Sequence, residues 1–282
     1  MRKTISIGSD LRIGGGSFVV MAGPCAVESR EQLCATADAV AESGAGLLRG
    51  GAYKPRTAPG SFQGLGAEGL DLLTEASRRT GLDVVTEVLD PRDVERVAQH
   101  AAVLQVGSRN MQNFPLLREV GRLRLPVLLK RGASATITEL LHAADYILAE
   151  GNESIILCER GLRSFDSSTR YLLDLAAVPV LQQRTPLPVV VDPSHGTGHA
   201  AFVAPMAQAA MAAGADGVLV EVHANPDEAL CDGQQALTPP RFAKLMSQLE
   251  QMAPLFEQRL SAPGRAQGAP ALPKGPHAST TR

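Results

Sequence analysis

The chain of 282 residues contains no tryptophan, and aromatic residues make up only 4% of it. RNA-binding platforms stack bases on exposed aromatic rings, so this composition argues against such a platform. The net charge is −2, so no overall positive field attracts nucleic acid. We therefore expect small-molecule ligands and no nucleic-acid partner.

Long apolar runs are also missing, since none approaches the roughly 20 residues that a helix needs to cross a bilayer. The N-terminal residues 1–8 lack the apolar segment of a secretory signal. The cysteines are few and form no CxxC pair; they are Cys25, Cys34, Cys158 and Cys231. This usage is typical of reduced thiols, so we expect a cytoplasmic protein without a membrane partner.

Short apolar segments recur along the chain, each ending in a charged or glycine-rich tip before a helical pattern. Continuous apolar strands that alternate with helices are typical of a parallel sheet covered on both faces. Eight such units predict one α/β domain, a (β/α)8 TIM barrel over residues 1–262, because such barrels take about 250 residues. The predicted strands are residues 18–22, 47–48, 84–86, 103–106, 127–129, 155–157, 189–191 and 218–220.

Other elements flank these strands. A short β-hairpin is expected from residues 4–7 and 11–13, and helices are expected at 67–80, 168–177 and 238–250. Residues 263–282 are rich in Pro, Gly and Ala and hold almost no large apolar side chain, so they are predicted to be a disordered tail. Residues 64–69 match G-x-G-x-x-G, but they follow a long loop instead of a strand, so a dinucleotide site is not expected there.

The polar tips fall at the carboxyl ends of the strands, where barrel enzymes place their chemistry. Cys25, His195 and Glu221 lie at or just beyond the first, seventh and eighth strands, and Asp232 lies in the last loop. The first and eighth strands are neighbours in a closed barrel, so these four side chains can converge. A mixed sulfur, nitrogen and oxygen set suits Mn, Fe, Co or Zn better than Ca or Mg. For any one of the four, an ordinary packed or solvated side chain is the alternative.

Cations gather at or near the tips of the second, fourth, fifth and sixth strands. Like charges aimed into one cavity repel unless anions fill it, and Arg and Lys both suit phosphate and carboxylate. A small substrate with more than one phosphate is therefore expected, although a solvated surface is the alternative. Glu87 and Glu159 at the same level could orient the cations or move protons. The cations are Arg49, Lys54, Arg56, Arg109, Lys130, Arg131, Arg160 and Arg163.

Six stretches resemble 3-deoxy-D-arabino-heptulosonate 7-phosphate (DAHP) synthase, of the compact microbial class I branch that also holds 3-deoxy-D-manno-octulosonate 8-phosphate (KDO8P) synthase. The resemblance implies a (β/α)8 barrel, a divalent metal ion and a homodimer or homotetramer. It also implies condensation of phosphoenolpyruvate with erythrose 4-phosphate, the first step of the shikimate pathway to aromatic amino acids. The stretches are Gly23-Pro-Cys-Ala-Val-Glu-Ser29, Arg49-Gly-Gly-Ala-Tyr-Lys-Pro-Arg-Thr57, Lys130-Arg-Gly132, Cys158-Glu-Arg-Gly161, Asp192-Pro-Ser-His-Gly-Thr-Gly198 and Glu221-Val-His223.

The resemblance assigns roles to matching positions. It implies that the metal ligands are Cys25, His195, Glu221 and Asp232. It implies that phosphoenolpyruvate contacts Arg49, Lys54, Lys130, Arg109 and Arg160, with the two lysines near the carboxylate and reacting carbon and the last two arginines at the phosphate. Arg56 and Thr57 match the contacts of the aldose phosphate. Either Glu87 or His223 could handle the proton of the attacking water.

The activity itself is open to more than one interpretation. The stretch Lys54-Pro-Arg-Thr57 resembles the one found in the heptulosonate enzymes. The octulosonate enzymes have a stretch similar to Lys-Ala-Asn-Arg-Ser at this position. A Schiff-base aldolase on Lys130 is a further possibility, and so is a non-catalytic barrel that partners another synthase. His199 stands where relatives usually carry arginine, which leaves that arginine's role in phosphate or subunit contacts in question. The chain is also expected to lack the regulatory domain that some relatives carry in front of the barrel.

Cys231 lies next to Asp232 in the sequence. If Asp232 is a metal ligand, Cys231 can approach Cys25 when no metal is bound. We therefore hypothesise that air oxidation of the metal-free protein forms a disulfide between these two cysteines. An inert Cys231 is the alternative.

Overall fold

The computed structural model describes residues 2–56 and 58–264. Thr57 and the predicted tail from residue 265 onward lie outside the described residues, so the expectations for them stay predictions. Within the described range, no helix combines the length and the apolar character that a membrane crossing requires.

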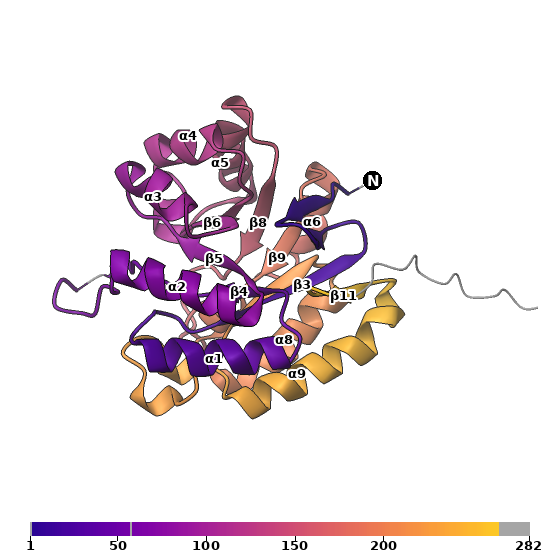
Figure 1. Ribbon diagram of the computed structural model, residues 1–282. Coiled ribbons are helices and arrows are strands. Elements are labelled where there is room, and N and C mark those ends of the chain that lie inside the picture. The colour runs from indigo at the N-terminus through magenta and orange to yellow at the C-terminus, as the bar shows by residue number, and fades with distance from the viewer. Residues whose placement is uncertain (1, 57, 265–282) are drawn as a thin grey trace, which may run out of the picture.

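Eight parallel strands form a closed barrel, and helices surround it (Figure 1). Each strand pairs with the next, and β10 pairs with β3 from Gly217 opposite Val19 to Glu221 opposite Gly23, which closes the ring. The predicted (β/α)8 barrel is thus confirmed, and each predicted strand falls within an observed one. The strands are β3 (Ser17–Gly23), β4 (Leu47–Arg49), β5 (Asp83–Glu87), β6 (Val103–Val106), β7 (Val127–Lys130), β8 (Ile155–Glu159), β9 (Val189–Val191) and β10 (Gly217–Glu221).

The helices follow the strands in alternation, and their apolar faces pack on the outer faces of the strands in one large core. Local capping fixes several starts: the Ser29 hydroxyl accepts the Gln32 amide at 3.1 Å, and Thr136 and Glu139 form a capping box. The helices are α1 (Arg30–Glu42), α2 (Ala67–Thr80), α3 (Val94–Ala98), α4 (Phe114–Arg122), α5 (Ile137–Ala149), α6 (Ala177–Arg184), α7 (Pro193–Thr197), α8 (Ala200–Ala212) and α9 (Pro239–Met252).

The helix predicted at residues 168–177 is wrong, because residues 168–176 form a loop and α6 begins only at Ala177. Backbone groups of the loop bond to other segments. Leu162 and Leu172 exchange two backbone hydrogen bonds, and the Arg170 amide donates to the Thr197 carbonyl at 3.0 Å. Amides used in this way cannot build the i to i−4 ladder of a helix, so tertiary pairing overrides the local pattern.

The hairpin of β1 (Ile5–Ile7) and β2 (Leu11–Ile13) is confirmed as an antiparallel pair. Its apolar side chains pack in one cluster with inward-facing residues of the barrel, such as Val19 and Leu219. The hairpin therefore closes the amino-terminal end of the barrel, and the polar tips are left at the other end. A further strand that was not predicted, β11 (Arg259–Ser261), pairs in parallel with the start of β3.

Candidate functional site

A cavity of about 250 Å³ opens at the carboxyl ends of the barrel strands. We call it the central cavity. Most of the predicted site residues line it, although they come from loops spread over the whole sequence. These residues are Arg49, Lys54, Arg56, Glu87, Arg109, Lys130, Arg160, His195 and Asp232.

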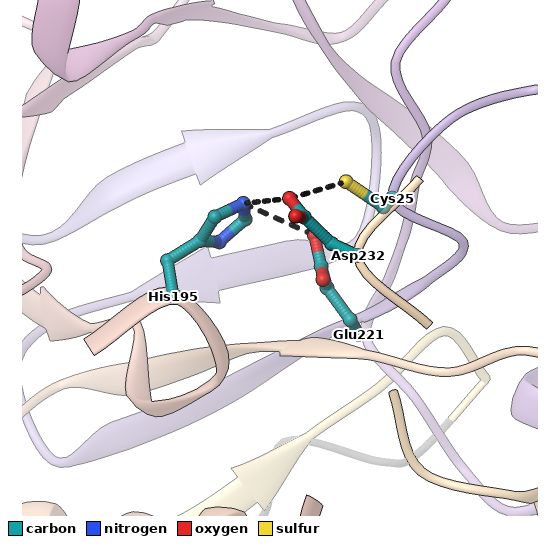
Figure 2. Close-up of side chains that lie close together, drawn as sticks. All are labelled: Cys25, His195, Glu221 and Asp232. Atoms are coloured by element: carbon teal, nitrogen blue, oxygen red, sulfur yellow. Dashed lines mark hydrogen bonds and ion pairs between the residues drawn. The ribbon is translucent and has the colours of Figure 1, made fainter. Parts of the chain in front are cut away.

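The four predicted metal ligands meet at one side of this cavity. One ligand atom from each of them lies within 4.8 Å of the other three. Figure 2 shows the four side chains converging: Cys25 from the loop after β3, His195 from α7, Glu221 from the end of β10 and Asp232 from the loop beyond. Closure of the barrel between β10 and β3 brings these segments together.

The hydrogen bonds of His195 leave one ring nitrogen facing oxygen acceptors. Its Nδ1 lies 2.7 Å from an Asp192 carboxylate oxygen. Burial lowers the pKa of His195 despite the neighbouring carboxylates, so the ring is neutral at pH 7 with its proton on Nδ1. The Nε2 lone pair then faces Glu221 Oε1 at 3.1 Å and Asp232 Oδ2 at 3.9 Å. A lone pair and two carboxylates repel unless a cation lies among them, so the donor set fits a metal ion.

Asp192 serves two partners and was missed as a site residue from the sequence. Besides the contact with His195, its Oδ2 lies 2.5 Å from Lys130 Nζ. Burial opposes ionisation of Asp192, but His195 and Lys130 hold its pKa well below the usual range. Asp192 also caps α7 through the His195 amide, and the Asp-Pro start of this short helix was the available signal.

Glu221 is fully buried at the end of β10 and is held from both sides. Arg49 Nη1 donates to Oε1 at 3.0 Å, and Gln235 Nε2 donates to Oε2 at 2.7 Å. Burial opposes ionisation of Glu221, but the neighbouring His195, Arg49 and Lys54 lower its pKa. The carboxylate is therefore ionised and fixed in orientation.

Asp232 is held by Arg170, which the sequence did not reveal as a site residue. Asp232 has a φ of +54°, a left-handed conformation that is uncommon for a residue other than glycine. Arg170 Nη1 lies 3.3 Å from its Oδ1, while Oδ2 faces Cys25 Sγ at 3.4 Å. Despite burial, Arg170 is the main cause that holds the pKa of Asp232 at about 2.

Cys25 lies in a pair of sulfur atoms surrounded by cations. Its Sγ is 3.4 Å from Cys231 Sγ and 3.1 Å from Lys54 Nζ, and Arg56 donates to Cys231. The hydrogen bond with Cys25 lowers the pKa of Cys231, while the same bond and burial raise the pKa of Cys25. The pair therefore favours ionisation of Cys231 over Cys25, and the neighbouring charge of Lys54 also lowers the pKa of Cys231.

Two arginines of the central cavity carry buried N–H groups without an acceptor. Arg49 Nε and Arg160 Nη1 have no hydrogen-bond partner in the part of the chain that the structure describes. Arg160 is only 5% exposed, and its guanidinium lies 4.3 Å from the ring centre of Tyr171. The Arg109 side chain also makes no hydrogen bond or ion pair with a described residue. Unsatisfied buried donors are costly, so these groups fit an anion.

Not every predicted cation or acid faces the central cavity. Arg131 Nη1 lies 2.8 Å from Glu159 and 3.0 Å from Asp174, so it forms a buried ion pair beneath the site. Neither Arg131 nor Glu159 lines the central cavity. Arg163 lines a neighbouring cavity instead.

The two predicted proton handlers are placed differently. Glu87 lines the central cavity and accepts a hydrogen bond from Gln105 Nε2 at 3.1 Å. Gly107 leaves room for it, because a Cβ there would lie 1.9 Å from Glu87 Oε1. His223 does not line the cavity; its Nδ1 accepts the Asn225 amide and its Nε2 lies 3.4 Å from a Glu28 oxygen. Glu87 is therefore the one placed to reach a ligand.

Comparison with known proteins connects this geometry to a family. The sequence model of the DAHP synthetase I family matches residues 2–258. The "Phospho-2-dehydro-3-deoxyheptonate aldolase" of Thermotoga maritima is 50% identical over 244 residues, which are 86% of this chain and 72% of that protein. The "2-dehydro-3-deoxyphosphooctonate aldolase" of Desulfatibacillum aliphaticivorans is 31% identical, over 88% of this chain and 97% of that protein.

Solved structures agree with the sequence comparisons. The crystal structure of the Thermotoga maritima DAHP synthase superposes with a TM-score of 0.89 at 47% identity, covering 92% of this chain and 76% of that one. A truncated form of the same synthase gives a TM-score of 0.86 at 44% identity, and this comparison covers 92% of this chain and 95% of that one.

Proposed function

The chain belongs to the DAHP synthetase I family, and from that premise we propose how its residues act. The enzyme is a 3-deoxy-7-phosphoheptulonate synthase: it condenses phosphoenolpyruvate with erythrose 4-phosphate and water to give DAHP and phosphate, at the start of the shikimate pathway. One observation supports this site most: a four-ligand group and arginines with unpaired N–H groups line one cavity.

Cys25, His195, Glu221 and Asp232 would hold a divalent ion, and their mixed donor set favours Mn, Fe, Co or Zn. When bound, such an ion would supply Lewis-acid polarisation of the aldehyde carbonyl. Asp192 and Arg170 would orient these ligands, since each bonds one of them from outside.

Phosphoenolpyruvate would bind across the cationic side of the cavity. Arg109 and Arg160 would hold its phosphate, and the unpartnered Arg160 Nη1 supports that role. Lys54 and Lys130 would hold its carboxylate beside the reacting carbon, with Arg49 nearby. Both lysines are buried and fixed, Lys54 by Cys25 and Lys130 by Asp192, so little ordering would remain to be done on binding.

The chemical steps then need mainly positioning and one proton acceptor. C3 of phosphoenolpyruvate attacks the aldehyde carbon, and a C–C bond forms. The aldehyde oxygen becomes a hydroxyl by taking up one of the two protons that the added water gives up, and the other proton leaves with the phosphate. Positive charge develops at C2, where the oxygen of water adds while Glu87 takes a water proton. The bond between C2 and the phosphate oxygen then breaks, and inorganic phosphate leaves as the C2 ketone forms.

The choice of aldose would rest on Arg56 and on Thr57, which lies outside the described residues. Arg56 lines the central cavity and would bind the aldose phosphate. The Lys54-Pro-Arg-Thr57 stretch supports erythrose 4-phosphate. KDO8P synthesis from arabinose 5-phosphate is the alternative, since proteins named for that activity are about one third identical to this chain.

Phosphate release from phosphoenolpyruvate tests the proposal. We expect release with erythrose 4-phosphate, loss of it after chelation and recovery with manganese. Faster turnover with arabinose 5-phosphate would move the chain to the alternative activity, and no turnover of the purified chain would favour a non-catalytic role. We further propose that the enzyme acts in the cytoplasm. We also propose that it is a homodimer or homotetramer, and size-exclusion chromatography with light scattering measures that oligomeric state.

A further inference from the structure

A second cavity of about 470 Å³ lies beside the central one. The two cavities share Ser108, Arg109 and Arg160 as lining residues. The arginines proposed to hold the phosphate of phosphoenolpyruvate therefore form a wall with space on both sides. None of the residues proposed for the metal or the aldose lines the second cavity.

The far side of this wall adds another cation. Arg163 lines only the second cavity of the two, and its amide is anchored to the Ala133 carbonyl at 2.7 Å. Its guanidinium makes no hydrogen bond or ion pair with a described residue. Glu139, the acid that lines this cavity, is already engaged by the Thr136 amide and hydroxyl.

The environment of Tyr171 indicates a positive electrostatic potential beside the second cavity. It lines the second cavity, and the Arg160 guanidinium lies over its ring. Although burial opposes ionisation, Arg160, Arg170 and Arg109 lower the pKa of the Tyr171 phenol. Three guanidinium groups thus act on one hydroxyl beside a cavity large enough for a hydrated phosphate.

We propose that the second cavity is an oxyanion subsite that receives the inorganic phosphate after its bond to C2 breaks. The ion passes from Arg109 and Arg160 to Arg163, and it leaves without crossing the metal and aldose sides of the central cavity. The inference rests on the proposed function, because that reaction is the source of the phosphate.

Phosphate binding without turnover tests the subsite. Inorganic phosphate is titrated by calorimetry into the manganese-loaded enzyme saturated with phosphoenolpyruvate, in the absence of an aldose. Phosphoenolpyruvate then fills the central phosphate position. We expect Arg163→Gln to weaken phosphate binding about tenfold, as for one charge-assisted hydrogen bond. Ser134→Asp, which puts a carboxylate on a residue that lines the same cavity, should weaken it as well.

Two controls locate the ion. Arg78→Gln removes the same charge from an exposed helix position and should leave phosphate affinity at the wild-type value. Arg56→Gln removes the proposed aldose-phosphate contact, and this variant should still bind inorganic phosphate. Adding Arg163→Gln to the same chain should then weaken that binding. Equal affinity in wild type and Arg163→Gln overturns the inference, as does loss of all binding in Arg56→Gln.

A kinetic readout separates this inference from the proposed function. At saturating erythrose 4-phosphate, added phosphate should inhibit the wild type in a mixed pattern against phosphoenolpyruvate, since it can bind after that substrate. In Arg163→Gln the pattern should become competitive. A competitive pattern in both enzymes removes the subsite but leaves the synthase activity established, whereas absence of turnover in the wild type removes the proposed function.

Discussion

An Asp192 carboxylate oxygen lies 2.7 Å from Nδ1 of His195, and the same oxygen contacts the ammonium group of Lys130. One buried acid therefore connects a proposed metal ligand with a proposed substrate lysine. Asp192→Asn should keep an acceptor for Nδ1–H but lose the charge that holds the lysine.

We expect Asp192→Ala to lower metal affinity by about 10- to 100-fold, and Asp192→Asn to lower it less, because an outer partner fixes the tautomer of a ligating histidine. Competition with a chromogenic chelator measures that affinity. Asp145→Asn, on an exposed helix face, is the matched control. Wild-type metal affinity in Asp192→Ala would contradict the orienting role.

Replacement of Cys25 tests the metal group directly. Cys25→Ala removes one of the four proposed ligands, so it should abolish metal-supported turnover and leave less bound metal after dialysis. Cys34→Ala, which changes a half-buried thiol on α1, should keep both the turnover and the bound metal of the wild type. Full activity of Cys25→Ala after thorough chelation would contradict the assignment of Cys25 as a metal ligand.

The close pair of sulfur atoms predicts a redox response of the metal-free enzyme. Cys25 Sγ and Cys231 Sγ are 3.4 Å apart, so a small movement allows a disulfide. Prolonged aerobic chelation should therefore remove two free thiols, and the treated enzyme, unlike one chelated without oxygen, should stay inactive after manganese is restored until a reductant is also added. Cys231→Ala should resist this inactivation. Mass spectrometry that finds both thiols free after the treatment would refute the hypothesis.

A side chain at position 107 is expected to displace the carboxylate of Glu87. A Cβ at this position would lie 1.9 Å from Glu87 Oε1, so Gly107→Ala must displace the carboxylate or the backbone. We expect kcat to fall at least tenfold and the free energy of unfolding to fall by about 1–3 kcal/mol, as for an overpacked site. Gly60→Ala, whose Cβ would meet no atom of a described residue within 4 Å, is the control for steady-state kinetics and urea unfolding. Equal kcat values for both variants would argue against a role of Glu87.

Much of the barrel could be predicted because its strands are continuous apolar runs that end at polar tips. The loop at 168–176 could not, since the amides of Arg170 and Tyr171 bond to carbonyls of the turn after His195, more than 20 positions further along the chain. Local patterns also could not indicate β11, whose three residues contain a single apolar side chain and pair with β3.

In the candidate site, too, some residues could be predicted from the sequence and others could not. Residues such as Cys25 and Glu221 stand at strand ends, so the topology alone brings them together. Arg170 and Gln105 act by reaching across to a neighbouring loop or strand, and no spacing in the sequence encodes that reach. His223 adjoins a strand end as well, but its ring turns to Glu28 and away from the cavity.

The pairing of β10 with β3 has a consequence for the order of assembly. Cys25 and Asp232 are 207 positions apart, and they meet only when the first and last barrel strands have joined. A chain that is still being synthesised, or one in which the ring stays open, presents isolated donors instead of a chelating set. Tight binding of the proposed metal ion would therefore require the finished barrel, and the bound ion would stabilise the closed ring against opening.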